Sequence, residues 1–360
     1  MRTLTAEEAR RIAVRAQLLD ARRPTDLLAT VEHLAFLQLD PVAAVAPAAD
    51  LVSWSRLGDV YAPADLERLA WQEHRLFEYG GADVAHLPSV VTLRPVSDLR
   101  LYLPSMRAPF AYEGAQAWWD ANAGFRSRVV DQLRAEGALL SKAIPDTAEV
   151  PWRSTGWTDN RNVNQLLELM ARRGVVAVAG RVGRQRLWDL AERVYPSDVE
   201  ELSLPEALRE RDERRLRALG IARPRMVGDA GEEVVVEGVD GVWRVDPGAT
   251  AEGFEGRAAL LSPFDRLVHD RERAMDLFGF EYLIEMYKPK DKRRWGYFAL
   301  PVLLHHRLVG KLDATADRKG GVFRVDALHE DLRLTKRQRA EVDDEIDSLA
   351  GWLGLEVRRP

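Results

Sequence analysis

The chain has 360 residues, of which 46% are hydrophobic and 30% are charged, a composition typical of folded proteins that excludes wholesale disorder. At roughly 150 residues per domain, this length predicts two to three domains. Lysine and arginine number 52 against 57 aspartates and glutamates, so the protein is not a globally basic nucleic-acid binder. Cysteine is absent, which excludes disulfides, iron–sulfur clusters and cysteine nucleophiles and agrees with a cytoplasmic location.

The first 110 residues are expected to form short helices followed by a small β-hairpin. Thr5 and Glu8 make a capping box, in which a hydroxyl and a glutamate three residues on satisfy each other's backbone donors. Further helices are predicted from Asp26 and over roughly 46–57 and 63–75, followed by a turn at Gly80-Gly81. This order is typical of a winged-helix module.

Residues 111–198 repeat the order of helices and hairpin. The predicted elements are helices over Phe125–Glu136, Leu139–Ile144 and Asn162–Met170 and a hairpin over Val175–Trp188. The third helix would face a DNA groove and the hairpin would be the wing. A weaker third copy over 199–256 has a helix at Leu204–Leu219 and another hairpin.

From residue 257 the pattern changes to short, turn-bounded, β-rich segments. They are Leu260–Asp265, Tyr282–Tyr287, Trp295–Leu304, Leu308–Ala314 and Gly321–Val325. We therefore expect a small β-barrel over 257–330 and a C-terminal helix in 331–360. The predicted fold class is α+β: tandem winged helix-turn-helix domains (1–110, 111–198 and 199–256) followed by the barrel and the helix.

Common cofactor and metal signatures are missing from the sequence. The seven histidines do not pair at metal-protease spacing, and no phosphate loop, dinucleotide fingerprint or nucleophile elbow is present. We therefore predict neither a metal site nor a cofactor. No window approaches the 18 or more uninterrupted apolar residues that a membrane span needs, and the N-terminus carries no apolar signal segment.

Gln38 and Asp40 are polar residues within an apolar run, so we place them at the edge of the core. Because proline disfavours the helical conformation in the residue before it, Asp40 should be extended. Residues i and i+2 of an extended segment point the same way, so an amide and a carboxylate would project together, with Leu39 toward the core. In a helix they would lie about 200° apart. The alternative is that Asp40 only caps a following helix.

Basic residues gather at predicted loops and turns. These are Arg172, Arg181, Arg184 and Arg186 at the end of the third helix and on the hairpin of the second module, Lys292 and Arg293 in a linker, and Arg318 and Lys319 in a turn. Each cluster alone could be an ordinary solvated loop. Together with winged-helix patterning they favour a nucleic-acid groove.

Several motifs in one order resemble the AlkZ/YcaQ family of winged-helix DNA glycosylases, which excise alkylated bases and unhook interstrand crosslinks. The motifs are Leu37-Gln38-Leu39-Asp40, Trp54-Ser55-Arg56-Leu57-Gly58, Leu260–Arg271, Phe278-Gly279-Phe280, Lys292–Tyr297, Leu308–Asp313 and Ala316–Lys319. The resemblance covers nearly the whole chain. It implies three winged helices and a β-barrel in a C shape around double-stranded DNA that carries alkylated bases.

The resemblance also implies residue roles. The family's catalytic pair is Gln-x-Gln or Gln-x-Asp, so the catalytic residues would be Gln38 and Asp40. We expect DNA contacts from Arg56 as well as from the basic residues above, in a monomeric enzyme associated with the nucleoid. One departure is Gly81–His86, where many relatives have His-Glu-Ala, with Asp83 and His86 as the possible substitutes.

Two other functions fit the same patterns. A transcription regulator built from winged helices would bind DNA without catalysis, although regulators usually dimerise on two half-sites and no dimer helix is evident. An inactive family member could serve as a damage sensor. No lysine lies near Gln38 and Asp40 in sequence, which disfavours a Schiff-base lyase.

Overall fold

The computed structural model describes residues 2–40, 42–80, 90–153 and 161–360. They form two compact units, a larger unit of residues 1–63 and 212–360 and a smaller unit of residues 64–211. The predicted Gly80-Gly81 turn lies partly outside the described residues. Asp83 and His86, the possible substitutes for the family's His-Glu-Ala, lie wholly outside them. The division into two compact units does not test the boundaries of the five predicted modules, which stay predictions.

One sheet of the larger unit joins the N-terminus to a hairpin more than 200 residues later. Strand β1 (Arg2–Leu4) pairs in parallel with β9 (Glu232–Val236), which pairs antiparallel with β10 (Val239–Val245) and through it reaches β8 (Ile221–Ala222). The predicted hairpin of the third module is therefore confirmed. Helix α1 (Ala6–Ala16) shares a hydrophobic core with this sheet.

The N-terminal helices begin where local capping predicts. Thr5 and Glu8 form the capping box of α1, and the carboxylate of Asp26 caps α2 (Leu27–Leu34) by accepting a backbone N–H from its first turn. Helix α3 (Ala48–Leu57) lies within the predicted range, and nine of its ten residues are buried, all except Asp50.

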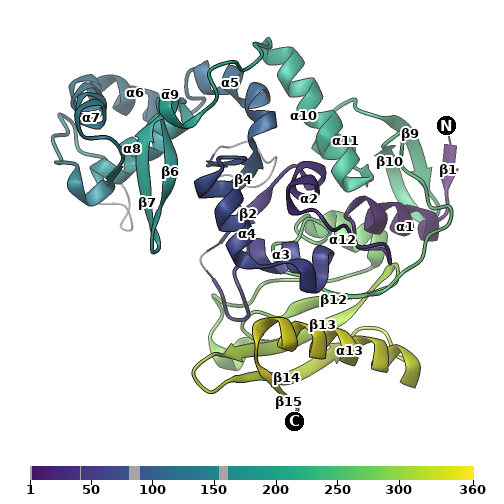
Figure 1. The fold of residues 1–360 in the computed structure, drawn as a ribbon. Coiled ribbons are helices and arrows are strands. Elements are labelled where there is room, and N and C mark those ends of the chain that lie inside the picture. Colours follow the sequence, from purple (N-terminus) through teal and green to yellow (C-terminus); the bar gives the residue numbers. More distant parts are fainter. Residues whose placement is uncertain (1, 41, 81–89, 154–160) are drawn as a thin grey trace. The chain divides into compact units, whose positions relative to one another are not determined.

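The C-terminal part of the larger unit is a five-stranded sheet. Its strands, in spatial order, are β11 (Ala258–Leu260), β12 (Leu300–Leu304), β13 (Arg307–Asp317), β14 (Val322–Glu330) and β15 (Glu356–Arg358). Helix α13 (Lys336–Leu353) contacts β11, β12 and β15 and lies alongside the sheet in Figure 1. Strands β11 and β15 are the two edges of this sheet, so the predicted closed barrel is not confirmed.

The chain between β11 and β12 differs from the prediction. Helix α12 (Arg271–Phe278), capped by the carboxylate of Asp270, was not expected. The strand predicted at Tyr282–Tyr287 is wrong, because 279–299 is irregular apart from one 3₁₀ turn at Lys290–Lys292. The aromatic residues that suggested strands there pack against one another in stacks instead.

The smaller unit consists mainly of helices and two short sheets. Its elements are α4 (Pro63–Glu67), β3 (Leu76–Tyr79), β4 (Val91–Pro95), α5 (Leu99–Arg107), α6 (Glu113–Ala121), α7 (Ala123–Glu136), β5 (Leu139–Leu140), α8 (Asn162–Arg172), β6 (Val176–Val182), β7 (Gln185–Leu190) and α9 (Ala191–Val194). Helix α10 (Leu204–Leu219) crosses from this unit to the larger one, and α11 (Pro224–Val227) follows it.

One predicted helix of the smaller unit is wrong. The expected helix at Leu139–Ile144 is a two-residue strand, β5, followed by a 3₁₀ turn. Strand β5 pairs with β7, which pairs with β6, so the predicted hairpin is confirmed as part of a three-stranded sheet. Helices α7 and α8 agree with the prediction, and their buried faces share a core with both strands of the hairpin.

Candidate active site and nucleic-acid surface

The predicted pair lies at the end of a short strand of the larger unit. Strand β2 (Leu37–Leu39) contains Gln38, and Asp40 follows it directly. Gln38 lies on the extended backbone of β2, and both polar side chains are half-buried. Leu37 is fully buried, whereas Leu39 is only half-buried, so the strongest anchor of this strand to the core is the residue before the pair.

The carboxylate of Asp40 has a local partner and no role in capping a helix. Its Oδ1 accepts the backbone N–H of Val42 at 2.9 Å, which closes a turn after the strand. Burial raises the pKa of Asp40 above the usual aspartate range, and the hydrogen bond from Val42 opposes that shift. The next helix, α3, begins only at Ala48 behind Pro47, so the alternative role of Asp40 as a helix cap is excluded.

The loop after Asp40 is held against the turn between β13 and β14. Ala316 donates its backbone N–H to the carbonyl of Ala44 at 2.9 Å, and Arg318 Nη2 donates to the carbonyl of Val45 at 3.0 Å. Arg318 and Lys319 are both exposed. The structure therefore brings Arg318, and with it the adjacent Lys319, to the segment that follows Gln38 and Asp40.

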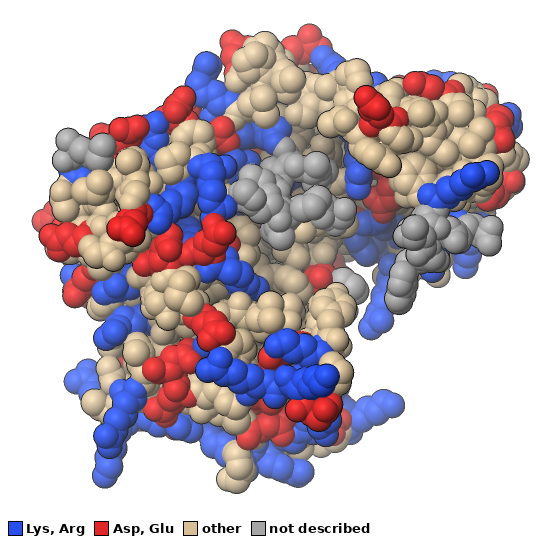
Figure 2. All heavy atoms as spheres, turned by 180° about the vertical axis from the view of Figure 1, so that it is seen from behind, with Lys and Arg blue, Asp and Glu red and all other residues tan. Residues whose placement is uncertain are grey.

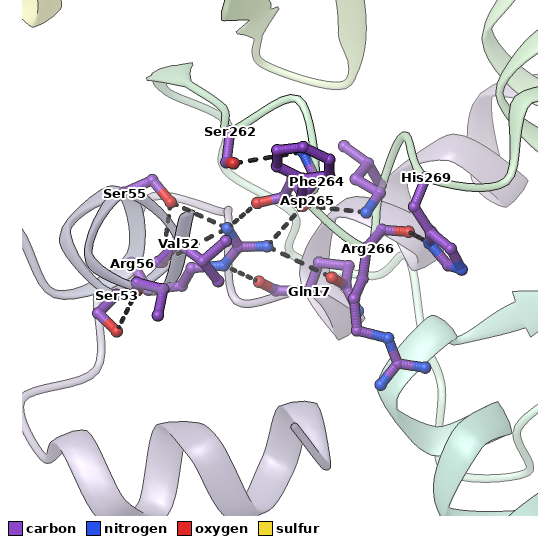
Figure 3. Close-up of polar contacts among 12 residues, drawn as sticks. Gln17, Val52, Ser53, Ser55, Arg56, Ser262, Phe264, Asp265, Arg266 and His269 are labelled. Carbon is purple, nitrogen blue, oxygen red and sulfur yellow. Dashed lines mark hydrogen bonds and ion pairs between the residues drawn. The ribbon is translucent and has the colours of Figure 1, made fainter. Parts of the chain in front are cut away.

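Arg56 does not contact DNA in this fold, which corrects the prediction. Its side chain is 0% exposed and forms a two-pronged ion pair with Asp265, one arm of which measures 3.0 Å between Nη2 and Oδ1 (Figure 3). Its Nε donates to the carbonyl of Gln17 at 3.0 Å. A buried charge is tolerated only when it is paired and hydrogen-bonded, and here both conditions are met within the protein.

Asp265 and Arg266 are two residues whose importance sequence reasoning missed. Asp265 holds Arg56 in α3 and also accepts the backbone N–H of Leu267 at 2.9 Å. Arg266 donates to the carbonyl of Leu34 at the end of α2, and its guanidinium lies 4.6 Å from the ring centre of Phe36. The two neighbours thus contact the segments on either side of β2. The sequence feature that could have revealed them is the pair of adjacent charged residues within the otherwise apolar segment 260–268.

Four predicted DNA-binding arginines belong to the smaller unit. Arg181 donates to Glu78, a side chain 2% exposed, at 2.5 Å and lies 5.4 Å from the ring centre of Trp71. Arg186 pairs with Glu78 and with Glu168 of α8. The charges of both arginines are therefore balanced inside the unit, where they brace the β6–β7 hairpin against β3 and α8.

The other two arginines of this set differ in exposure. Arg172 is half-buried and donates to the carbonyl of Gly80 at 2.7 Å. Arg184 is exposed beside Gly183, a glycine with φ of +60° at the hairpin tip, and forms no ion pair with any described residue. Arg184 is therefore the member of the set best placed for an external anion.

Lys292 and Arg293 lie in the irregular segment of the larger unit. Lys292 is exposed, and Arg293 is half-buried with its Nε donating to the carbonyl of Lys288 at 3.0 Å. On the face drawn in Figure 2, lysine and arginine side chains are interspersed with aspartate and glutamate.

The described residues include no group of three or more histidine, aspartate or glutamate side chains arranged to hold a metal ion. None of their helices is both long and apolar enough to cross a membrane. Of the alanines that follow Asp40, Ala46, Ala48 and Ala49 are buried, whereas Ala44 is half-buried and Ala43 is exposed.

Comparison with known families assigns the chain to a family. The family model described as "DNA glycosylase AlkZ-like" matches residues 31–352, which include β2, Asp40 and the Asp265-Arg266 dipeptide. The chain belongs to the AlkZ-like DNA glycosylase family. The resemblance inferred from the sequence motifs is thereby confirmed.

A solved AlkZ-like structure is similar over the full length. The DNA glycosylase AlkZ of Streptomyces sahachiroi aligns with a TM-score of 0.60 and 17% sequence identity, covering 100% of both chains. At this identity the comparison shows a shared fold. The AlkZ-like family supports a role as a DNA glycosylase in DNA repair.

Proposed function

We propose that this AlkZ-like protein is a monofunctional glycosylase that hydrolyses the N-glycosidic bond of cationic alkylated purines such as N7-alkylguanine. The observation that carries the proposal is the half-buried carboxylate of Asp40, two residues from the amide of Gln38 on extended backbone, in a chain of this family. Unhooking of interstrand crosslinks joined through N7 of guanine would follow from the same chemistry.

The reaction needs few groups because the leaving base already carries a positive charge. When the bond between C1′ and N9 breaks, its electron pair moves to N9 and N7-alkylguanine leaves as a neutral base. No general acid is required, in contrast to ordinary glycoside hydrolysis, in which a second carboxyl group protonates the leaving oxygen. The enzyme has only to stabilise the sugar cation and activate water.

Asp40 supplies both of these functions. Its carboxylate stabilises the positive charge that develops at C1′ and accepts the proton of the attacking water. Among the described residues only Oδ1 has a hydrogen-bond partner, the N–H of Val42, which leaves Oδ2 for the water. Burial favours this role, because it raises the basicity of the carboxylate.

Gln38 orients the water. A side-chain amide both donates and accepts hydrogen bonds without changing charge, so it can fix a water between itself and the carboxylate. The buried Leu37 anchors β2 on one side, and the contacts of Ala44 and Val45 fix the loop on the other. Both side chains therefore start from a defined backbone.

The lysines offer a test of hydrolysis against a lyase mechanism. Lys311 is fully buried, and its Nζ pairs with Asp331 at 2.5 Å. Lys319 is exposed and lies next to Arg318, which contacts the loop after Asp40, so its amine is the first candidate for a lyase nucleophile. Treatment of the reaction with borohydride should trap no covalent DNA adduct; an adduct lost in Lys319→Ala would refute monofunctional hydrolysis.

We further propose that the protein acts as a monomer on double-stranded DNA in the cytoplasm. The order α7, β5, α8, β6 and β7 supports assignment of a winged helix, with α8 toward the groove and the β6–β7 hairpin as the wing. The exposed cations Arg184, Lys292, Arg318 and Lys319 would contact phosphates.

A panel of lesions tests the proposed chemistry. Under single-turnover conditions we expect excision of N7-methylguanine and unhooking of a nitrogen-mustard crosslink, with little release of uracil or hypoxanthine. The neutral bases leave poorly without a general acid, and the roles proposed for Gln38 and Asp40 supply none. Efficient removal of uracil or hypoxanthine would refute the charge argument, and DNA binding without any excision would favour a regulator or a damage sensor.

A further inference from the structure

An ordered loop with an exposed tyrosine lies between α12 and β12 in the larger unit. Residues 279–299 form no strand and only one 3₁₀ turn, an unusual length of irregular chain inside a compact unit. Such long irregular connections are more often functional than structural. The segment contains one of the motifs by which the sequence resembles its family, Lys292–Tyr297, of which the proposed reaction uses only the two cations.

The base of this loop is fixed by a buried carboxylate. Glu285, with a side chain 2% exposed, accepts the backbone N–H groups of Arg294 and Trp295 at 2.7 and 2.8 Å and pairs with Lys288 Nζ at 2.8 Å. Trp295 in turn is buried and stacks on Tyr282 with ring centres 6.4 Å apart. These contacts close the loop on itself, so its conformation does not depend on a ligand.

The tip of the loop presents Tyr287 to solvent. Lys288 donates its backbone N–H to the carbonyl of Glu285 at 2.9 Å, which closes a tight turn with Tyr287 at its third position. Tyr287 is 85% exposed. A ring with this exposure contributes little to the packing of the unit, so its face is accessible to a ligand.

Basic residues follow this ring in the sequence. The seven residues that follow Tyr287 contain one acid, Asp291, and five basic residues, Lys288, Lys290, Lys292, Arg293 and Arg294. Lys290 and Lys292 are exposed. A second partly exposed ring, Tyr297, lies 5.0 Å from the guanidinium of Arg293. Exposed aromatic rings interleaved with cations are the pattern by which proteins bind single-stranded nucleic acid.

We propose that Tyr287 stacks on an unpaired nucleotide of the DNA while Lys290 and Lys292 contact the neighbouring phosphates. Binding of phosphates would use only the cations and would not account for the exposed ring, so the proposal gives the ring a partner of its own. In an intact duplex both faces of each base are already stacked. Extrusion of a damaged base opens such a face, and this inference therefore rests on the proposed glycosylase function.

Binding to undamaged DNA tests the loop separately from catalysis. Three labelled DNAs of one sequence are compared by fluorescence anisotropy: an intact duplex, a duplex with a single-nucleotide bulge and the single strand. In the bulge, 2-aminopurine reports stacking as a loss of its fluorescence. No glycosidic bond is cleaved, so a protein that binds in the predicted way without excising N7-methylguanine would refute the proposed function and leave this inference standing.

Tyr287→Ala should weaken binding to the bulged duplex and the single strand about 5- to 100-fold and abolish the 2-aminopurine quenching. Its affinity for the intact duplex and its salt dependence should not change, whereas Tyr287→Trp should bind as the native protein does. Lys290→Ala should instead weaken binding to all three DNAs and reduce the salt dependence. Tyr112→Ala, which alters a 72% exposed tyrosine of the smaller unit, is the matched control.

Three results would overturn the inference. They are equal losses by Tyr287→Ala on intact and bulged duplex, unchanged quenching in that variant, and losses in Tyr112→Ala as large as those in Tyr287→Ala. Failure of the native protein to bind any of the three DNAs would overturn both this inference and the proposed function.

Discussion

The buried ion pair between Arg56 and Asp265 allows a quantitative prediction about stability. Asp265→Asn removes the negative charge and leaves the guanidinium of Arg56, 0% exposed, without its counter-charge. Breaking a buried pair in this way costs about 3–5 kcal/mol of unfolding free energy. For a unit of roughly 200 residues this corresponds to a fall in Tm on the order of 10 °C.

The assay is urea unfolding followed by circular dichroism, with an exposed ion pair of the same unit as control. Glu7→Gln removes the pair between Glu7 and Arg11, whose side chains are 48% and 37% exposed, and should cost no more than about 0.5 kcal/mol. The loss in Asp265→Asn should persist in high salt, because screening acts weakly on buried charges.

A double variant separates the pair from its surroundings. Replacing both partners, as in Arg56→Met with Asp265→Leu, removes the uncompensated charge and should recover a large part of the loss. Recovery should be incomplete, because Gln17 and Leu267 each lose a hydrogen-bond partner. If Asp265→Asn costs no more than Glu7→Gln, the ion pair does not hold α3 in place and the account of Arg56 is wrong.

Three further predictions concern pH and salt. Because burial raises the pKa of Asp40, the excision rate should rise with pH as Asp40 loses its proton, and the midpoint of this rise should lie above the ordinary aspartate range. A midpoint at or below that range would contradict the role of burial. Burial, reinforced by the charge of Arg266, lowers the pKa of His269 to about 4, so the unfolded chain binds a proton first as pH falls below about 6.5. Stability should then fall by up to about 1.4 kcal/mol per pH unit between those values, and His269→Gln should remove this part of the dependence in urea unfolding. Arg184→Glu should weaken binding of all DNA sequences and lower the slope of log affinity against log salt by about 0.9 per phosphate lost, and an unchanged slope would make the hairpin tip an ordinary solvated loop.

Local signals predicted the parts of the fold that depend on neighbouring residues. The caps at Thr5 and Asp26 lie within three residues of the donors that they satisfy, so the starts of α1 and α2 were readable from sequence. The β5 strand was misread as a helix because its partner, β7, lies more than 40 residues later. Residues Tyr282–Tyr287 were misread as a strand for the same reason, since the stacking of Tyr282 on Phe280 and Trp295 is set by tertiary packing.

The same distinction applies to the candidate site. The strand at Gln38 agrees with the extended segment predicted before Pro41, which was inferred from a local effect of proline on the preceding residue. Arg56 was misassigned to DNA because its partner, Asp265, is 209 residues away and no local pattern connects them. Intramolecular pairing of Arg181 and Arg186 was likewise invisible, since Glu78 lies on a separate strand.

The measurement that tests the central claim most directly compares native protein and Asp40→Asn on a duplex with a single N7-methylguanine. Under single-turnover conditions, with abasic sites cleaved by alkali, the variant should excise the base at least about 10²-fold more slowly, the range for loss of a positioned acid–base group. Its unfolding curve and its affinity for undamaged DNA should match those of the native protein. Excision at the native rate by Asp40→Asn would contradict the assignment of this carboxylate as the catalytic group.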